Sequence, residues 1–329
     1  MKNQITFFLP VLLLMMCFKV NAQDIHFSQF YAIPMNLNPA LTGLIEDKIS
    51  LGHRQQGNGG LSEKFLTSYV GFEKSVSLKN KDIFGYGVLV IGDKTAKSGI
   101  HSYNLSASGS YSKQLNNFII SSGVQFSYTQ KRLSGTFTLP DDPDQVYTAQ
   151  QALNGVYSPI NQLNINAGIL ASLKLNDINS LYFGISSYYI NQHKESFSNL
   201  KDLNLKPKTS FHAGLRLYTS DEQKFAIIPN IRTMIMNKAT NILFGTNMEY
   251  YYSSNNSNFI SLGGWYRYNN SYCISLGMGI NQWNLGLSYD NFYKTSLNGI
   301  ASMKAMEIHL QYRLSSSKIG LRPDITLRI

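Results

Sequence analysis

The sequence predicts an all-β fold, a transmembrane antiparallel β-barrel of about 14 strands that follows a short N-terminal segment outside the barrel wall. Three observations support this prediction. Apolar and polar residues alternate with a period of two from about residue 48 onward. Many of these runs reach about ten residues, the length that a tilted strand needs to cross a bilayer. Only 15% of the 329 residues are charged, and abundant Tyr, Phe, Ser, Asn and Gly favour strands and tight turns.

Residues 1–22 are predicted to be a secretory signal peptide. Lys2 supplies a positive charge, residues 5–18 are mostly apolar, and Ala22 permits cleavage before Gln23. Cleavage removes two of the 29 basic residues and none of the 19 acidic ones, which leaves a net charge of +8. Cys273 is then the single cysteine of the mature chain, so an internal disulfide is excluded. The basic residues are scattered rather than clustered, and we expect no nucleic-acid partner.

Residues 23–47 interrupt the alternation. Pro34 and Pro39 lack a backbone N–H and do not fit in a central strand. The Asn38-Pro39 step favours a turn, and Thr42-Gly43 can close one. This segment also carries three aromatic residues between positions 27 and 31, which make it too apolar for a free tail. We therefore expect an N-terminal periplasmic segment or a plug inside the barrel.

The predicted barrel spans residues 48–314. Its strands follow the alternation of apolar and polar positions, because successive side chains of a strand point to opposite faces. Strands are expected near 48–54, 65–76, 83–92, 100–113, 117–131, 162–174, 180–191, 209–218, 224–236, 240–252, 258–268, 271–280, 282–292 and 304–314.

The last predicted strand shows the two faces most clearly. Met306, Ile308 and Leu310 fall on one face, and Glu307 and His309 alternate with them on the other. An apolar face suits lipid, and a polar face suits a watery or plugged lumen. Most tryptophans and tyrosines are expected in the aromatic girdles at the membrane interfaces, but by the same pattern Trp265 instead lines the lumen or contacts the plug. The candidate lumen-facing residues are Trp265, Arg267, Glu307, His309 and Arg313.

The connections between the predicted strands tend to alternate between short and long, and outer-membrane barrels have short periplasmic turns and long external loops. We therefore expect an integral outer-membrane protein in contact with lipid, with both termini periplasmic and residues 315–329 as a C-terminal tail. The short connections near 237–239 and 269–270 depart from the pattern. A soluble β-fold is the alternative, and it would need protected sheet edges.

The sequence contains no strong pattern for catalysis or cofactor binding. Gly85-Tyr86-Gly87 lacks the third glycine of a dinucleotide-binding loop, and the six histidines are spread singly. Asp141, Asp142 and Asp144 could bind Ca²⁺, although a solvated loop is the simpler interpretation. We expect no enzymatic activity, no cofactor and no metal. A barrel phospholipase stays open as an alternative, because its Ser/His pair would be placed by the fold.

The N-terminal segment carries a specific pair of motifs. His26-Phe27-Ser28-Gln29-Phe30-Tyr31 is followed by Leu37-Asn38-Pro39-Ala40-Leu41-Thr42-Gly43, just after the predicted signal peptide. This arrangement resembles the start of the PorP/SprF family, and the resemblance covers essentially the whole mature chain. At positions 53–57 the run His-Arg-Gln-Gln-Gly stands where relatives more often carry a Tyr-Arg-x-Gln-Trp type run. This departure weakens any role that the resemblance would assign to residues 53–57.

The resemblance implies a non-enzymatic outer-membrane component of the type IX secretion system of Bacteroidota. Such a protein supports export or surface attachment of cargo that bears a type IX C-terminal signal, including gliding-type adhesins, beside a periplasmic ring and a translocon. A passive porin or hydrophobic-solute channel is the alternative. The candidate partner-binding or plug residues are His26, Phe27, Ser28, Gln29, Phe30, Tyr31, Asn38, Pro39, Ala40, Thr42 and Gly43.

Overall fold

The computed structural model describes most of the predicted mature chain. The described residues are 27–57, 64–95, 99–134, 136–139, 142–148, 151, 158–192, 204–219, 222–237, 239–252, 258–293 and 303–314. The predicted signal peptide (1–22), His26 and the predicted tail (315–329) lie outside them. No helix within these ranges is long and apolar enough to cross a membrane.

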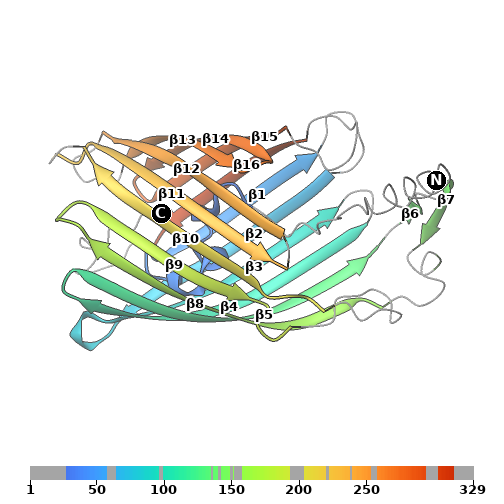
Figure 1. Ribbon diagram of the computed structural model, residues 1–329, viewed down its shortest axis with the longest axis horizontal. Helices are drawn as coiled ribbons and strands as arrows, with labels where there is room; N and C mark the ends of the chain where they lie inside the picture. The colour runs from blue at the N-terminus through green and yellow to red at the C-terminus, as the bar shows by residue number, and fades with distance from the viewer. Residues whose placement is uncertain are drawn as a thin grey trace, which may run out of the picture.

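Fourteen antiparallel strands form a closed barrel, which confirms the predicted fold class (Figure 1). Every predicted strand range overlaps one of the observed strands. The strands are β1 (Lys48–Gly57), β2 (Lys64–Ser77), β3 (Ile83–Thr95), β4 (Ile100–Leu115), β5 (Phe118–Leu133), β8 (Ile160–Lys174), β9 (Ser180–Tyr188), β10 (Lys208–Tyr218), β11 (Phe225–Met236), β12 (Ala239–Tyr251), β13 (Phe259–Arg267), β14 (Ser271–Ile280), β15 (Trp283–Phe292) and β16 (Lys304–Arg313).

The barrel closes where β1 pairs with β16. Lys48 lies opposite Arg313 of β16 and opposite Glu73 of β2, so both edges of β1 are paired. Closure matters because hydrocarbon offers no partner for an unpaired backbone N–H or C=O group. We call the end of the barrel at which β1 begins the Lys48 end, and the opposite end the Gly57 end.

A two-stranded sheet lies outside the barrel, where the sequence predicted only a long connection (132–161). β6 (Thr136–Leu139) pairs with β7 (Asp142–Thr148). The sequences TFTL and DPDQVYT contain β-branched and aromatic residues that favour strands. The alternation in this region is too short to predict a strand that crosses a membrane, and the sequence therefore predicts a connection here and not a barrel strand.

The two faces of the barrel wall have opposite chemistry. Met306 and Ile308 are exposed on the outer surface, with exposed fractions of 65% and 46%, whereas Glu307, which lies between them, and Gln311, which lies further along the strand, are buried in the lumen. β14 repeats the pattern, since Ile274 and Leu276 are both 57% exposed. Apolar side chains therefore surround the barrel and polar ones line it, as lipid outside and a filled lumen inside require.

Residues 27–47 lie inside the barrel, and we call this segment the plug. It contains three short helices, η1 (Phe30–Ala32), α2 (Pro34–Leu37) and η2 (Pro39–Leu41), drawn in blue within the barrel in Figure 1. Leu41 and Leu44 are fully buried, and they belong to an apolar core that also includes residues of the surrounding strands. The core of this protein therefore lies between the plug and the inner face of the wall.

The plug runs along the lumen from one end towards the other. Ser28 binds Asp290, which is close to the Gly57 end of β15, whereas Asp47 accepts a hydrogen bond from the backbone N–H of Ser75 near the Lys48 end of β2. The chain then enters the wall at Lys48. The location of both termini in the periplasm remains a prediction, because residues 1–26 and 315–329 are not described.

Candidate functional site

Hydroxyl groups of the wall satisfy the backbone of the plug. Such short helices leave most of their carbonyl oxygens without a partner inside the segment. The hydroxyls of Ser110, Ser121 and Ser186 donate to the carbonyl oxygens of Thr42, Ala40 and Leu37 at 2.7, 2.6 and 2.8 Å. Each of these three hydroxyls replaces a hydrogen bond that the plug backbone cannot make with itself.

Amide side chains of the wall extend this docking surface. The Gln125 side chain donates to the carbonyl oxygen of Met35 at 3.2 Å, and that of Gln311 donates to the carbonyl oxygen of Ala32 at 3.0 Å. These two residues lie on β5 and β16. The plug is therefore held from several directions around the lumen, and not against one strand.

Glycines of the wall allow the plug backbone to approach closely. A Cβ atom on Gly85 would lie 1.9 Å from the carbonyl oxygen of Thr42, and one on Gly123 would lie 2.3 Å from the carbonyl carbon of Pro39. Gly43 itself has a φ of +63°, a conformation that favours glycine, and a Cβ there would lie 2.5 Å from a wall carbonyl oxygen. Larger residues at these positions would displace the plug.

Asn38 connects the plug to two neighbouring strands. Its side-chain Oδ1 accepts a hydrogen bond from the backbone N–H of Ala40 at 2.9 Å and so caps the start of η2. Its Nδ2 donates to the carbonyl oxygens of Ile169 on β8 and Ile185 on β9, at 3.0 and 3.3 Å. One buried side chain therefore fixes both the turn of the plug and its position against the wall.

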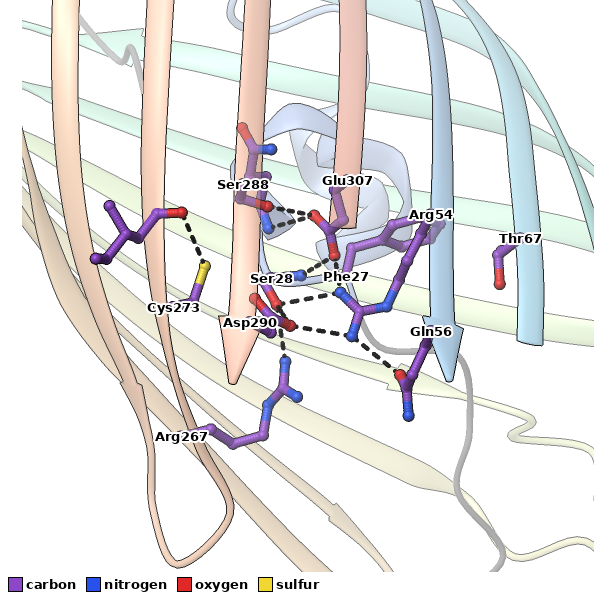
Figure 2. A network of polar contacts seen from close by, with 12 residues as sticks. Phe27, Ser28, Arg54, Gln56, Thr67, Arg267, Cys273, Ser288, Asp290 and Glu307 are labelled. Atoms are coloured by element: carbon purple, nitrogen blue, oxygen red, sulfur yellow. Dashed lines mark hydrogen bonds and ion pairs between the residues drawn. The ribbon is translucent and has the colours of Figure 1, made fainter. Parts of the chain in front are cut away.

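A buried ionic network holds the other end of the plug (Figure 2). Glu307 accepts hydrogen bonds from the backbone N–H groups of Ser28 and Gln29 at 2.7 and 3.0 Å. Arg54 lies between Glu307 and Asp290, and its Nη2 is 3.0 Å from Asp290 Oδ2. The Ser28 hydroxyl donates to the same Asp290 oxygen at 2.5 Å. Three strands and the plug thus meet in one network whose charged partners compensate each other.

Arg267 reaches the same network from β13. Its Nη2 donates to the Ser28 hydroxyl at 3.1 Å, and its guanidinium group lies 5.6 Å from the centre of the Phe292 ring. Figure 2 shows Arg54 and Arg267 approaching Ser28 from different strands. Because a buried charge without a partner is costly, removing one member should weaken the attachment of Ser28.

Aromatic rings fill the space between η1 and the wall. Tyr31 stacks on Trp265 with ring centres 5.5 Å apart, and Phe30 packs edge-on against the same indole at 5.6 Å. Phe27 packs edge-on against Tyr69 of β2 at 5.4 Å. Trp265 is only 3% exposed, so it lies in the lumen in contact with the plug and not at the membrane interface.

Three small cavities border the plug. A cavity of about 90 Å³ lies between Gln29, Tyr31 and the strands β12–β16, towards the Lys48 end. Two cavities of about 10 Å³ each border Phe27, and each is large enough for roughly one water molecule. These three cavities beside the plug have the size of sites that hold water molecules.

The predicted site residues have different places in this arrangement. Of the candidate plug residues, His26 is not described, and the rest lie in the lumen. His309 lies edge-on to Tyr31 at 6.5 Å, whereas Arg313 is at the Lys48 end, where its Nη1 is 3.7 Å from Glu46. Of the proposed Ca²⁺ ligands, Asp141 is not described. No group of three or more metal-binding side chains occurs in the described part of the chain.

Sequence reasoning missed several residues of the site. Arg54 and Asp290 fall on the polar faces of their strands, but nothing in the one-dimensional pattern pairs them. The departure from the family pattern at positions 53–57 left Arg54 without an expected role. Gly85 and Gly123 also gave no signal, because their function depends on a backbone that approaches from a distant segment.

Comparisons with known proteins agree with this architecture. The family model described as "Type IX secretion system membrane protein PorP/SprF" matches residues 19–312. No curated protein sequence matches the chain. The toluene transporter TodX of Pseudomonas putida is similar in structure, with a TM-score of 0.54 and 12% identity over 88% of this chain and 98% of TodX. The monoaromatic hydrocarbon channel CymD has a TM-score of 0.52 and 12% identity over 86% of this chain and 93% of CymD. At these identities the likeness concerns the fold alone.

Proposed function

Because the chain belongs to the PorP/SprF family of type IX secretion system membrane proteins, we propose that it is a non-enzymatic, plugged component of that system in the outer membrane. In this proposal it supports the export or surface attachment of cargo with a type IX C-terminal signal, such as gliding-type adhesins. Its partners are then other components of the system, the periplasmic ring and the translocon. The match over residues 19–312 is the observation that carries the proposal.

The closed lumen supports a role as a scaffold. The plug occupies the barrel, and the largest of the three cavities described around it measures about 90 Å³. A folded cargo protein cannot pass such a lumen. We therefore propose that cargo moves through another component, and that this barrel contributes a rigid surface in the membrane, with the N-terminal motif held in one conformation by the wall.

The proposal is tested by replacing the plug in the native organism. Residues 27–43 are exchanged for a Gly-Ser sequence of equal length, and the outer-membrane fraction is checked for a heat-modifiable, folded barrel. We expect the barrel to insert while type IX cargo at the cell surface falls to the level of a strain without the protein. A Gly264→Ala strain is the control, because a Cβ at this position meets no atom within 4 Å. Normal surface cargo in the plug-exchange strain would overturn the proposal.

The alternative, a passive porin, predicts a different result for the same two proteins, the unmodified chain and the chain with the exchanged plug. A porin predicts solute uptake by liposomes that contain the unmodified protein. The proposal predicts uptake only after the plug has been exchanged. Uptake by the unmodified protein at the rate of an open porin would favour the alternative.

A further inference from the structure

The lipid-facing wall carries a groove that the plugged lumen does not explain. Its volume is about 920 Å³, and residues of β3, β4, β5, β8, β9 and β10 line it, most of them at outward-facing positions. This volume lies within the range of about 300–1,000 Å³ that is typical of small-molecule sites. The groove is independent of the proposed secretion role, because it lies on the opposite side of the wall from the plug.

The register of the sheet explains the shape of the groove. The floor is a row of small residues that are register partners on neighbouring strands. Gly109 pairs with Val124, Val124 with Ala167, and Ala167 with Ser187. The row ends at Thr209, which pairs with Ser187. Five neighbouring strands at a spacing of about 4.8 Å give a floor of about 19 Å.

Larger side chains form the two sides of the groove. Tyr111 and Ile169 stand on one side, two residues along their strands from the floor, and Phe126 stands on the other. The two sides are thus four residues apart, which corresponds to about 13 Å between their backbones along the strand direction. The side chains make the groove between them narrower than this. An α-helix, which is about 10–12 Å wide, does not fit. A single hydrocarbon chain does.

Positive charge gathers at one end of the groove. The floor row continues through Tyr86 to Lys74, which is exposed on the outer face of β2. Lys113 is exposed on β4, two residues beyond Tyr111, and two further exposed lysines lie in the turn η3 (Lys79–Lys81) next to β4. Asp82, which follows Lys81 in the sequence, accepts a hydrogen bond from the Tyr111 hydroxyl at 2.5 Å.

We propose that the groove binds one acyl chain of an anionic phospholipid, with the phosphate against Lys74 and Lys113 at the Lys48 end. Hydrocarbon is the medium that surrounds this face, and an acyl chain makes dispersion contacts along an apolar furrow. The cations at the end of the furrow select an anionic headgroup over a zwitterionic one. The barrel then carries a specific lipid as a structural part.

Native mass spectrometry of the detergent-purified full chain tests the proposal, with phosphatidylglycerol and phosphatidylethanolamine added in separate titrations. We expect one phosphatidylglycerol to remain bound under conditions that strip phosphatidylethanolamine. Ala167→Phe places a ring on the floor and should abolish this adduct. Gly264→Phe adds the same ring to the outer face of β13, where a Cβ has open space, and should retain it.

A second pair of variants tests the headgroup contacts. Lys74→Gln with Lys113→Gln should lower phosphatidylglycerol retention by about fivefold for each lysine, the effect expected for one cation near an anionic surface. Lys64→Gln with Lys304→Gln, at the Gly57 end, is the control and should change nothing. Equal retention by Ala167→Phe and Gly264→Phe would overturn the proposal. A chain dimer that Ala167→Phe disrupts, without any lipid adduct, would instead identify a second copy as the occupant.

Discussion

Replacing Gly85 by alanine should release the end of the plug without unfolding the barrel. The new Cβ would lie 1.9 Å from the carbonyl oxygen of Thr42, where an ordinary contact needs at least 3.4 Å, so the plug backbone must move away. That movement breaks the 2.7 Å hydrogen bond from Ser110 and the 3.2 Å hydrogen bond from the Gly43 N–H to Glu73. Overpacking costs about 1–3 kcal/mol and each lost hydrogen bond about 0.5–1.5 kcal/mol, which gives a total of about 2–6 kcal/mol.

Amide hydrogen exchange of residues 27–47 measures this loss directly, because local opening sets the exchange rate. A cost of 2 kcal/mol or more should accelerate exchange in the plug by about 30-fold or more, while exchange in the strands away from Gly85 stays unchanged. Gly264→Ala is the matched control, since its Cβ meets no atom within 4 Å, and its effect should stay within about 0.5 kcal/mol. Equal exchange in the two variants would refute the reasoning that close approach at Gly85 holds the plug.

Three further predictions concern the wall, the ionic network and the pH range of docking. Leu310→Arg should destabilise the inserted barrel by about 2–4 kcal/mol if residue 310 faces the bilayer midplane. Gln311→Ala should cost only about 1 kcal/mol, for its one hydrogen bond to the plug. Equilibrium unfolding in lipid vesicles compares the two variants, and equal losses of stability would contradict the assignment of residues 310 and 311 to opposite faces. Arg54→Ala should lower the free energy of unfolding by about 3–5 kcal/mol, because it leaves two buried carboxylates without their shared cation. Denaturant midpoints measure this loss of stability. A loss below 1 kcal/mol would show that the ionic network adds little. Burial raises the pKa of Tyr31 above its usual value of 10.0. The free energy that the neutral Tyr31 side chain contributes to plug docking should therefore be complete below pH 10 and decline only at higher pH. A phenolate absorbance signal from Tyr31 below pH 10 would contradict its burial.

The fold could be predicted because the barrel repeats a local rule. Each strand alternates between lipid and lumen, so Met306, Ile308 and Glu307 reveal their faces without any knowledge of their neighbours. The turns also follow from local composition. The N-terminal segment was recognised for a similar reason, since Pro34 and Pro39 cannot stand in a central strand.

The docking surface could not be predicted in the same way, because it depends on contacts between distant segments. The backbone N–H of Ser28 donates a hydrogen bond to Glu307, which is 279 positions away in the sequence. Gly85 must be a glycine only because the backbone of Thr42 passes close to it. A lumen-facing serine that holds a plug carbonyl looks the same in the sequence as one that faces water. The pairing of Arg54 with Asp290 likewise follows from the closure of the barrel, which brings the first strand beside the last ones.

Single-channel recording in planar bilayers tests whether the N-terminal segment seals a barrel that would otherwise conduct. We expect a silent trace for the unmodified chain and stable, pore-sized current steps once residues 27–43 are exchanged for a Gly-Ser sequence of equal length. Steps of the same size from both proteins would contradict this expectation.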